Sequence, residues 1–269
     1  MEAVVKVESG QPGPTVALFG GVHGNETVGV IAIQHLMEEL ELERGTAYLA
    51  LANPAAVAVG ERELSKNLNR CFITGNDGQT PEDVRARELM RLLDKCDALL
   101  DIHSYRDPAG DPFAICEPNA LEIARQFDIP LISTNWTTTE PGATDGYMYE
   151  QGKIGICLES GPTVFVQETL PVALDAAHKF LAHFGMISLA GAIETRTDQR
   201  IIEARQAFVR TSEEYSLDEN LKSFQKLSEG QIYGSHAGEN FVAGKDECII
   251  FPRPTAEIGT EAFVIGVEL

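Results

Sequence analysis

The residues that suggest chemistry begin in the segment LFGGVHGNET, residues 18–27, where a histidine and a glutamate stand three positions apart. His23 and Glu26 follow an apolar run and two glycines, at the point where a strand is expected to give way to a helix. Open α/β sheets bind ligands at this carboxyl edge. The glycines match neither G-x-x-x-x-G-K-[ST] nor a complete G-x-G-x-x-G, which disfavours a phosphate site. A glycine turn with Glu26 at a helix N-terminus is the simpler alternative.

A second histidine occupies an equivalent position. His103 ends the apolar run in LLDIHSY, residues 99–105, again at the carboxyl end of an expected buried strand. Two histidines and one glutamate with an open fourth position form a recognised catalytic zinc site, whereas a structural site takes four protein ligands and usually cysteine. Asp101 or a backbone carbonyl could hold the far ring nitrogen of a ligand histidine. The pattern predicts one Zn²⁺ per chain, although such ligands tolerate other divalent ions.

A glutamate stands at the end of a third apolar run. Glu159 lies in GICLESG, residues 155–161. Burying a carboxylate is costly unless it is paired or functional. Near a zinc-bound water, Glu159 would act as the general base and pass the proton to the leaving nitrogen. Three strand ends would therefore deliver these groups to one edge of a sheet.

The elements that position these residues follow from hydrophobic patterning. Residues 15–20 form a continuous apolar run that predicts a buried strand. Apolar positions then recur at helical spacing from about 26 to 43, and a strand is predicted at 46–52. This β-α-β opening indicates a mixed, mainly parallel sheet between helices, an α/β fold.

The alternation continues along the chain. Helices are predicted at 81–96, 119–127 and 167–185, and strands at 98–102, 113–118 and 153–160. Residues 134–152 are rich in Thr, Gly and aromatic residues without helical periodicity, which predicts a long loop. After about residue 187, short extended pieces are broken by glycines and prolines. The chain is therefore divided into a catalytic domain, 1–187, and a small β-rich domain, 188–269.

The motifs GGVHGNE, NLNRCF, LLDIHS and GICLESG, in this order, resemble those of the succinylglutamate desuccinylase/aspartoacylase family, which is related to the zinc carboxypeptidases. The resemblance covers about residues 15 to 165 by motif, and the β-rich tail is similar to the family's C-terminal domain. It implies that His23, Glu26 and His103 are zinc ligands and that Glu159 is the acid/base residue.

The same resemblance assigns roles within GERELSKNLNRCF, residues 60–72. It implies that Arg62 stabilises the developing oxyanion and that Asn69 and Arg70 bind the substrate carboxylate. Arginine suits both tasks, since its guanidinium grips a carboxylate through two parallel hydrogen bonds or polarises a carbonyl. A solvated loop with ordinary charges is the alternative.

One departure from the family concerns a second carboxylate. The family's acylases hold it with basic side chains shortly before the catalytic glutamate, but residues 131–152 here contain no Lys or Arg. Tyr147 lies in this segment and Arg106 just beyond His103, and both are candidates for substrate binding. A different acyl group or amine is therefore expected.

The composition limits which binding partners are expected. Forty-one acidic residues against 21 basic ones give a formal net charge of −20. Nucleic acids and anionic membranes reward a basic face, so neither is expected as a partner. Five widely spaced cysteines without a C-x-x-C pair, and an N-terminus unlike a signal peptide, indicate free thiols in the cytoplasm. Whether the chain forms homo-oligomers stays open.

These observations predict a zinc-dependent amidohydrolase that removes the acyl group from an N-acyl amino acid or a similar small acylated amine. One alternative is a carboxypeptidase-like enzyme that cuts small peptides with the same metal ligands. Another is a non-catalytic metal- or ligand-binding protein on the same scaffold, although a binder has no need of Glu159 or Arg62.

Overall fold

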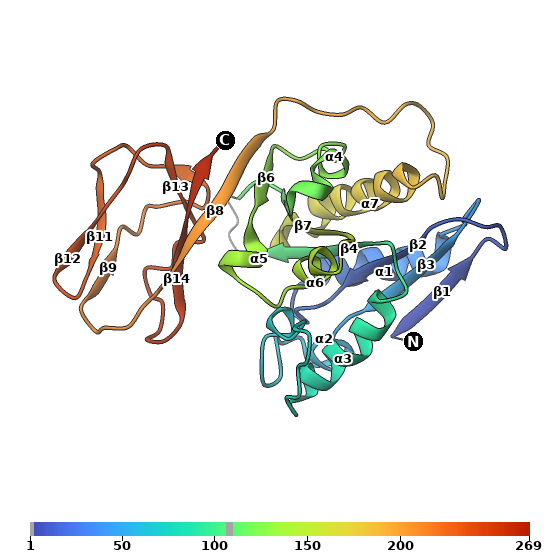
Figure 1. Ribbon diagram of the computed structural model, residues 1–269, viewed down its shortest axis with the longest axis horizontal. Helices are drawn as coiled ribbons and strands as arrows, with labels where there is room; N and C mark the ends of the chain where they lie inside the picture. The colour runs from blue at the N-terminus through green and yellow to red at the C-terminus, as the bar shows by residue number, and fades with distance from the viewer. Residues whose placement is uncertain (1–2, 106–109) are drawn as a thin grey trace.

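The computed structural model describes residues 3–105 and 110–269. In these residues an eleven-stranded mixed sheet runs through the centre of the fold (Figure 1). Its strand order is β1-β3-β2-β4-β7-β5-β6-β8-β14-β13-β10. The strands of the N-terminal part are β1 (Val4–Glu8), β2 (Thr15–Gly20), β3 (Thr46–Leu51), β4 (Ala98–Tyr105), β5 (Phe113–Cys116), β6 (Leu131–Thr134) and β7 (Ile154–Pro162).

Pairing is parallel across β3-β2-β4-β7 and again across β5-β6-β8 (Arg200–Val209). It is antiparallel at β1 and between β7 and β5. The fold is thus the expected α/β arrangement, with a mixed sheet that is mainly parallel where the candidate site lies.

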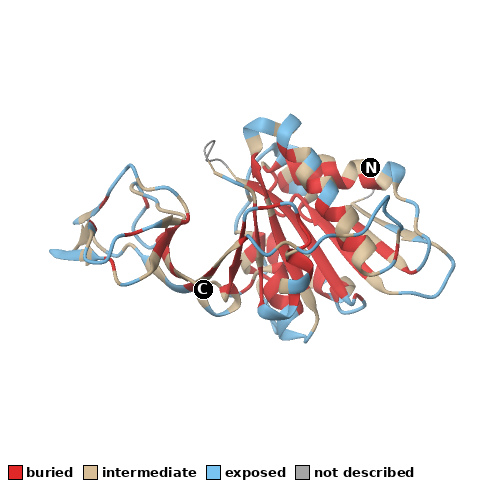
Figure 2. Ribbon diagram, turned by 90° about the horizontal axis from the view of Figure 1, so that it is seen from above, coloured by how far each residue is buried: buried red, intermediate tan, exposed pale blue. Residues whose placement is uncertain are grey.

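Helices cover both faces of this part of the sheet. They are α1 (Thr27–Glu39), α2 (Pro54–Val59), α3 (Pro81–Leu93), α4 (Leu121–Ala124), α5 (Trp136–Thr139), α6 (Thr144–Glu150) and α7 (Val166–His183), with short 3-10 turns at Leu68–Arg70, Pro118–Ala120 and Thr163–Phe165. Because strand side chains alternate between faces, Leu100 packs with α1 and α7, while Leu99 packs with α3 and α6. Figure 2 shows these strands as a buried layer between the helices.

Residues beyond α7 build the β-rich part at one end of the molecule (Figure 1). The strands β10 (Gln225–Lys226), β13 (Glu247–Ile250) and β14 (Glu261–Glu268) continue the large sheet from β8, and β9 (Tyr215–Leu217), β11 (Ile232–His236) and β12 (Glu239–Val242) form a separate three-stranded sheet. Stacked aromatic rings of Phe208 and Phe263 lie between the two sheets of this part. The division at residue 187 stays a prediction, and hydrogen bonds between β6 and β8 run across it.

The structure confirms each strand predicted between residues 15 and 160, with small differences in the ends. The predicted loop at 134–152 is wrong, because it contains the short helices α5 and α6. Their threonines and glycine are poor helix formers, so tertiary contacts stabilise them: the backbone N–H of Thr144 donates to Asn69 Oδ1. Among the described residues no helix combines the length and apolar character that crossing a bilayer demands.

Candidate active site

Close packing of α1 against β4 brings Glu26, which precedes α1, near the carboxyl end of β4. A Cβ on Gly29 of α1 would lie 2.1 Å from the carbonyl oxygen of Ile102 in β4, which only glycine permits. Glu26, immediately before α1, is thereby held between the ends of β2 and β4. His23 lies in the turn after β2, and its carbonyl accepts a hydrogen bond from the Glu26 N–H.

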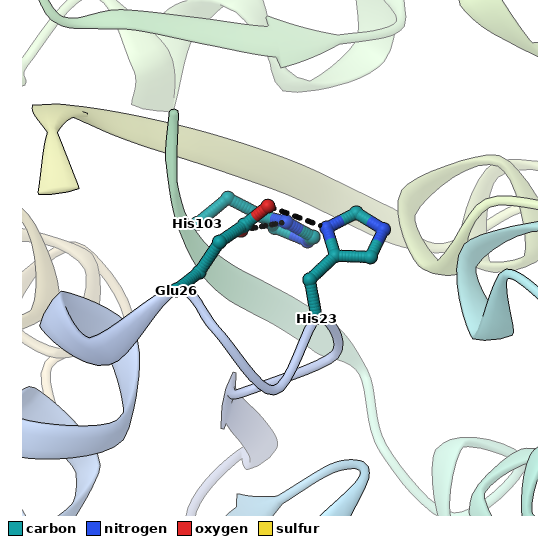
Figure 3. A group of neighbouring side chains, drawn as sticks. All are labelled: His23, Glu26 and His103. Atoms are coloured by element: carbon teal, nitrogen blue, oxygen red, sulfur yellow. Dashed lines mark hydrogen bonds and ion pairs between the residues drawn. The ribbon is translucent and has the colours of Figure 1, made fainter. Parts of the chain in front are cut away.

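Two imidazoles converge on one carboxylate (Figure 3). His23 Nδ1 lies 2.7 Å from Glu26 Oε1, and His103 Nδ1 lies 2.9 Å from Glu26 Oε2. All three residues are buried, and one potential ligand atom from each lies within 4.8 Å of those of the others. The structure therefore brings together the three residues predicted as ligands, with equivalent ring nitrogens facing the shared point.

A side-chain oxygen lies 3.0 Å from the far nitrogen of each ring. Asp101 Oδ2 lies 3.0 Å from His103 Nε2 and accepts a hydrogen bond from Thr144 Oγ1. Asn67 Oδ1 lies 3.0 Å from His23 Nε2. Partners of this kind fix the ring orientation of metal-binding histidines. Asn67 was missed by the sequence reasoning, although it begins the NLNRCF motif.

The electrostatics of the cluster favour a cation. Burial lowers the pKa of His23, which keeps its ring neutral and able to bind a metal. Burial also opposes a charge on His103, but Asp101 and Glu26 raise its pKa well above the ordinary value. The pKa of Glu26 is held low against its burial by the two histidines. Imidazole and carboxylate donors within a few ångströms of one buried point fit a divalent metal such as zinc.

Glu159 lies beside this cluster. It is directly opposite His103 in the parallel register of β4 and β7, and a carboxylate oxygen lies within 4.8 Å of a His103 ring nitrogen. Its Oε2 is buried without a hydrogen-bond partner. Burial, with the neighbouring Glu26, raises the pKa of Glu159 to about 7, a value suited to proton transfer near neutral pH. Cys157 is also close, but burial raises its thiol pKa, which disfavours a thiolate ligand.

The predicted arginines line one cavity with these residues. Its volume is about 1130 Å³, and its walls include Arg62, Asn69 and Arg70. The Arg62 guanidinium donates to Glu26 Oε1 at 3.0 Å. Arg70 forms an ion pair with Glu140, which follows α5. A substrate carboxylate that binds Arg70 would therefore share its guanidinium with Glu140 or displace Glu140 from it.

Two further arginines line the same cavity, Arg200 of β8 and Arg253 from the segment beyond β13. Desolvation at the cavity mouth, together with the charges of Arg62 and Arg70, lowers the pKa of Arg253, while Glu140 opposes the shift. Four guanidiniums around one cavity favour an anionic ligand. No motif marked Arg253 in the sequence, because it is brought to the site by the packing of distant segments.

One candidate for substrate binding, Tyr147, is not brought to the site. The Tyr147 hydroxyl donates to Asp94 Oδ1 at 2.6 Å, and its ring packs in the core formed with α3. Tyr147 is absent from the cavity wall, so the predicted role in substrate binding is corrected to one in packing. Arg106 lies outside the described residues.

Fold and site together define an α/β protein with a His-Glu-His cluster and a half-buried glutamate at the carboxyl edge of its parallel strands. A model of the succinylglutamate desuccinylase/aspartoacylase catalytic domain matches residues 12–184. The chain belongs to this family.

This chain matches only part of the length of its named relatives. The N-alpha-acetyl-L-2,4-diaminobutyric acid deacetylase of Halomonas elongata is 30% identical over 203 residues, 70% of this chain and 59% of that protein. The N-acyl-aromatic-L-amino acid amidohydrolase (carboxylate-forming) of Mus musculus is 33% identical over 178 residues, 57% of this chain and 55% of that enzyme. The chain thus spans little more than half the length of these two relatives.

A solved structure shares the whole fold. Succinylglutamate desuccinylase from Vibrio parahaemolyticus aligns with a TM-score of 0.81 over 99% of this chain and 86% of that chain, at 19% sequence identity. At this identity the likeness is one of fold alone. It includes the β-rich part as well as the sheet that carries the candidate site.

Asp101→Asn is expected to weaken zinc binding by about 10- to 100-fold, because the amide supports the His103 ring less strongly than the carboxylate does. Competition with a chelating dye measures this affinity. Glu117→Gln, which alters another buried carboxylate, is the matched control and should leave the affinity unchanged. Equal affinity in Asp101→Asn and wild type would contradict the role given to Asp101.

Proposed function

We propose that this protein is a zinc-dependent hydrolase that cleaves the amide bond of an N-acyl amino acid or a similar small acylated amine. The observation that carries the proposal is the convergence of His23, Glu26 and His103 beside the unpartnered carboxylate oxygen of Glu159. A bound zinc ion supplies a polarised carbonyl and an activated water at neutral pH.

The chain's own residues divide the remaining work. Glu159 accepts a proton from the attacking water and delivers it to the leaving nitrogen, for which a pKa of about 7 is well suited. Arg62, whose guanidinium reaches Glu26, lies where it can stabilise charge developing on the carbonyl oxygen. Asn69 and Arg70 orient the substrate through its carboxylate.

The family and the names of the relatives support this substrate class. Both the Halomonas and the mouse protein are named for removing acyl groups from amino acids. We extend that reaction to this chain as a proposal, together with a catalytic unit at 1–187 and a β-rich unit at 188–269. The five cysteines, all free and buried, support a reducing compartment such as the cytoplasm.

Hydrolysis of N-acetyl, N-formyl and N-succinyl amino acids by the zinc-loaded protein tests the proposal. Release of free amino acid from at least one compound is expected, and a peptide panel run in parallel should show slower turnover. Faster release from peptides would favour the carboxypeptidase-like alternative. One zinc per chain without turnover of either panel would favour the non-catalytic binder.

Arg253→Ala is expected to raise the KM for N-acyl amino acids by about tenfold with little change in kcat, because a charged hydrogen bond to the substrate carboxylate would be lost. Steady-state kinetics measure both constants. Arg205→Ala is a matched control, since both side chains are 53% exposed and Arg205 pairs with Glu203 on β8. A KM equal to that of the control would remove Arg253 from the site.

A further inference from the structure

The sheet register places an aromatic side chain directly beside the proposed general base. Glu159 of β7 is flanked by His103 of β4 on one side and by Phe113 of β5 on the other. Residues directly opposite each other in neighbouring strands project from the same face, with Cβ atoms about 4.5–5.5 Å apart. Phe113 therefore starts a wall of the cavity that leads away from the metal ligands.

Three more aromatic residues extend this wall. The ring of Phe113 lies 4.8 Å from that of Phe224 and 5.9 Å from that of Phe251, and the Phe251 ring lies 5.6 Å from Trp136. All four line the cavity that contains Glu159, and we call them the aromatic wall. Phe113, Trp136 and Phe224 are buried in one hydrophobic cluster and Phe251 is partly buried against it, so Phe251 offers the most ring surface to a ligand.

The β-rich part holds two of these rings in unusual backbone conformations. Phe224 and Phe251 have φ values of 62° and 50°, which bulky residues rarely adopt. Hydrogen bonds fix both, from Phe224 N–H to the carbonyl of Ile249 and from Phe251 N–H to Ser223 Oγ. Strained residues of this kind cluster at ligand sites. Trp136 is fixed as well, since its Nε1–H donates to Ser133 Oγ.

Each described arginine that lines the cavity already has a carboxylate partner. Arg70 and Arg253 both lie near Glu140, and Arg200 is paired with Glu268. The segment that contains Trp136 carries no Lys or Arg between residues 131 and 152. Beside the aromatic wall, the Arg200 guanidinium donates to the Phe224 carbonyl and is paired with Glu268, so a second substrate carboxylate would have to compete with Glu268 there.

We propose that the aromatic wall is a specificity subsite that binds an aromatic ring of the substrate on one side of the scissile amide. This inference rests on the proposed function and narrows its substrate class from N-acyl amino acids in general to those that carry an aromatic group. The ring belongs either to the amino acid or to the acyl group, two sources with the same chemistry.

Trp136 gives a direct binding readout, since it is the single tryptophan of the chain. Titration of the metal-free protein with N-acetyl-L-phenylalanine and with N-benzoyl-L-alanine should give a saturable change of fluorescence for at least one of them. Its dissociation constant should be at least about tenfold below that of N-acetyl-L-alanine. If neither aromatic compound binds more tightly than N-acetyl-L-alanine, or none of the three changes the fluorescence, the subsite is overturned. Because this protein is metal-free, the result does not depend on turnover.

Kinetics of the zinc-loaded enzyme show whether the amino-acid side chain or the acyl group supplies the substrate's aromatic ring. N-acetyl-L-phenylalanine and N-benzoyl-L-alanine are compared with N-acetyl-L-alanine, and one aromatic compound should have a kcat/KM about tenfold or more above it. A preference for the first places the amino-acid side chain on the wall, and a preference for the second places the acyl group there. Faster hydrolysis of N-acetyl-L-alanine than of both would refute the subsite while leaving the proposed function intact.

Variants of Phe251 test whether the aromatic wall causes the preference for aromatic substrates. Phe251→Ala, and the milder Phe251→Leu in case the first folds poorly, should reduce the aromatic preference to about threefold or less. Phe241→Ala removes a ring from the other aromatic cluster of the β-rich part and should leave the preference unchanged. An unchanged preference in both Phe251 variants would contradict the inference. Saturable binding of the aromatic compound without any turnover would instead contradict the proposed function.

Discussion

Glu159→Gln is expected to lower the rate of hydrolysis by about 10²- to 10⁴-fold without loss of the metal. Glutamine has the shape of glutamate but cannot take a proton from water at neutral pH. The residue lies opposite His103 in the sheet register, yet it is outside the cluster in which His23, Glu26 and His103 converge. Removing its charge should therefore affect proton transfer more than metal binding.

The experiment measures kcat and zinc content on the same preparations of wild type and variant. Because one oxygen of the wild-type carboxylate is buried and has no hydrogen-bond partner, the amide is expected to fit without unfolding the site. Glu168→Gln, in the first turn of α7, provides a control for the same chemical change at an exposed position. A Glu159→Gln variant with wild-type kcat would remove this residue from the reaction.

His103→Ala is expected to abolish zinc binding at micromolar metal and to reduce hydrolysis by about 1000-fold or more. The variant loses a ligand, and with it both the polarised carbonyl and the activated water. It also leaves the buried carboxylate of Asp101 without its ring partner. Metal analysis after dialysis should give about one zinc per wild-type chain and almost none for the variant.

Thermal unfolding adds a readout that is independent of turnover. Zinc at 100 times its dissociation constant stabilises a protein by about 2.7 kcal/mol, so it should raise the Tm of wild type but not of His103→Ala. His35→Ala, a change in a half-exposed histidine on α1, is the control and should respond to zinc as wild type does. An equal rise in Tm for His103→Ala would show that zinc binds elsewhere.

The residues at the strand ends could be predicted from the sequence because their placement follows from topology. Parallel strands meet at one edge of a sheet, so His23, His103 and Glu159 had to lie near one another once the β-α-β pattern was recognised. Asp101 followed from the alternation of strand side chains, since it shares a face with His103.

The other parts of the site depend on packing between segments that no local pattern connects. Glu140 meets Arg70 across 70 positions of sequence, and Arg253 approaches from a turn beyond β13. Helices α5 and α6 lack helical periodicity and are stabilised by contacts such as that between Asn69 and Thr144. Tyr147 was misjudged for the same reason, because its direction depends on where α6 packs.

The pairing of β6 with β8 has a consequence for how the chain can be cut. A fragment that ends at residue 187 would lose β8 and leave unpaired those backbone N–H and C=O groups of β6 that face β8. Leu131 and Ile132, both buried beside that seam, would then meet water. Open, apolar strand edges recruit other chains, so such a fragment is expected to self-associate rather than persist as an independent enzyme.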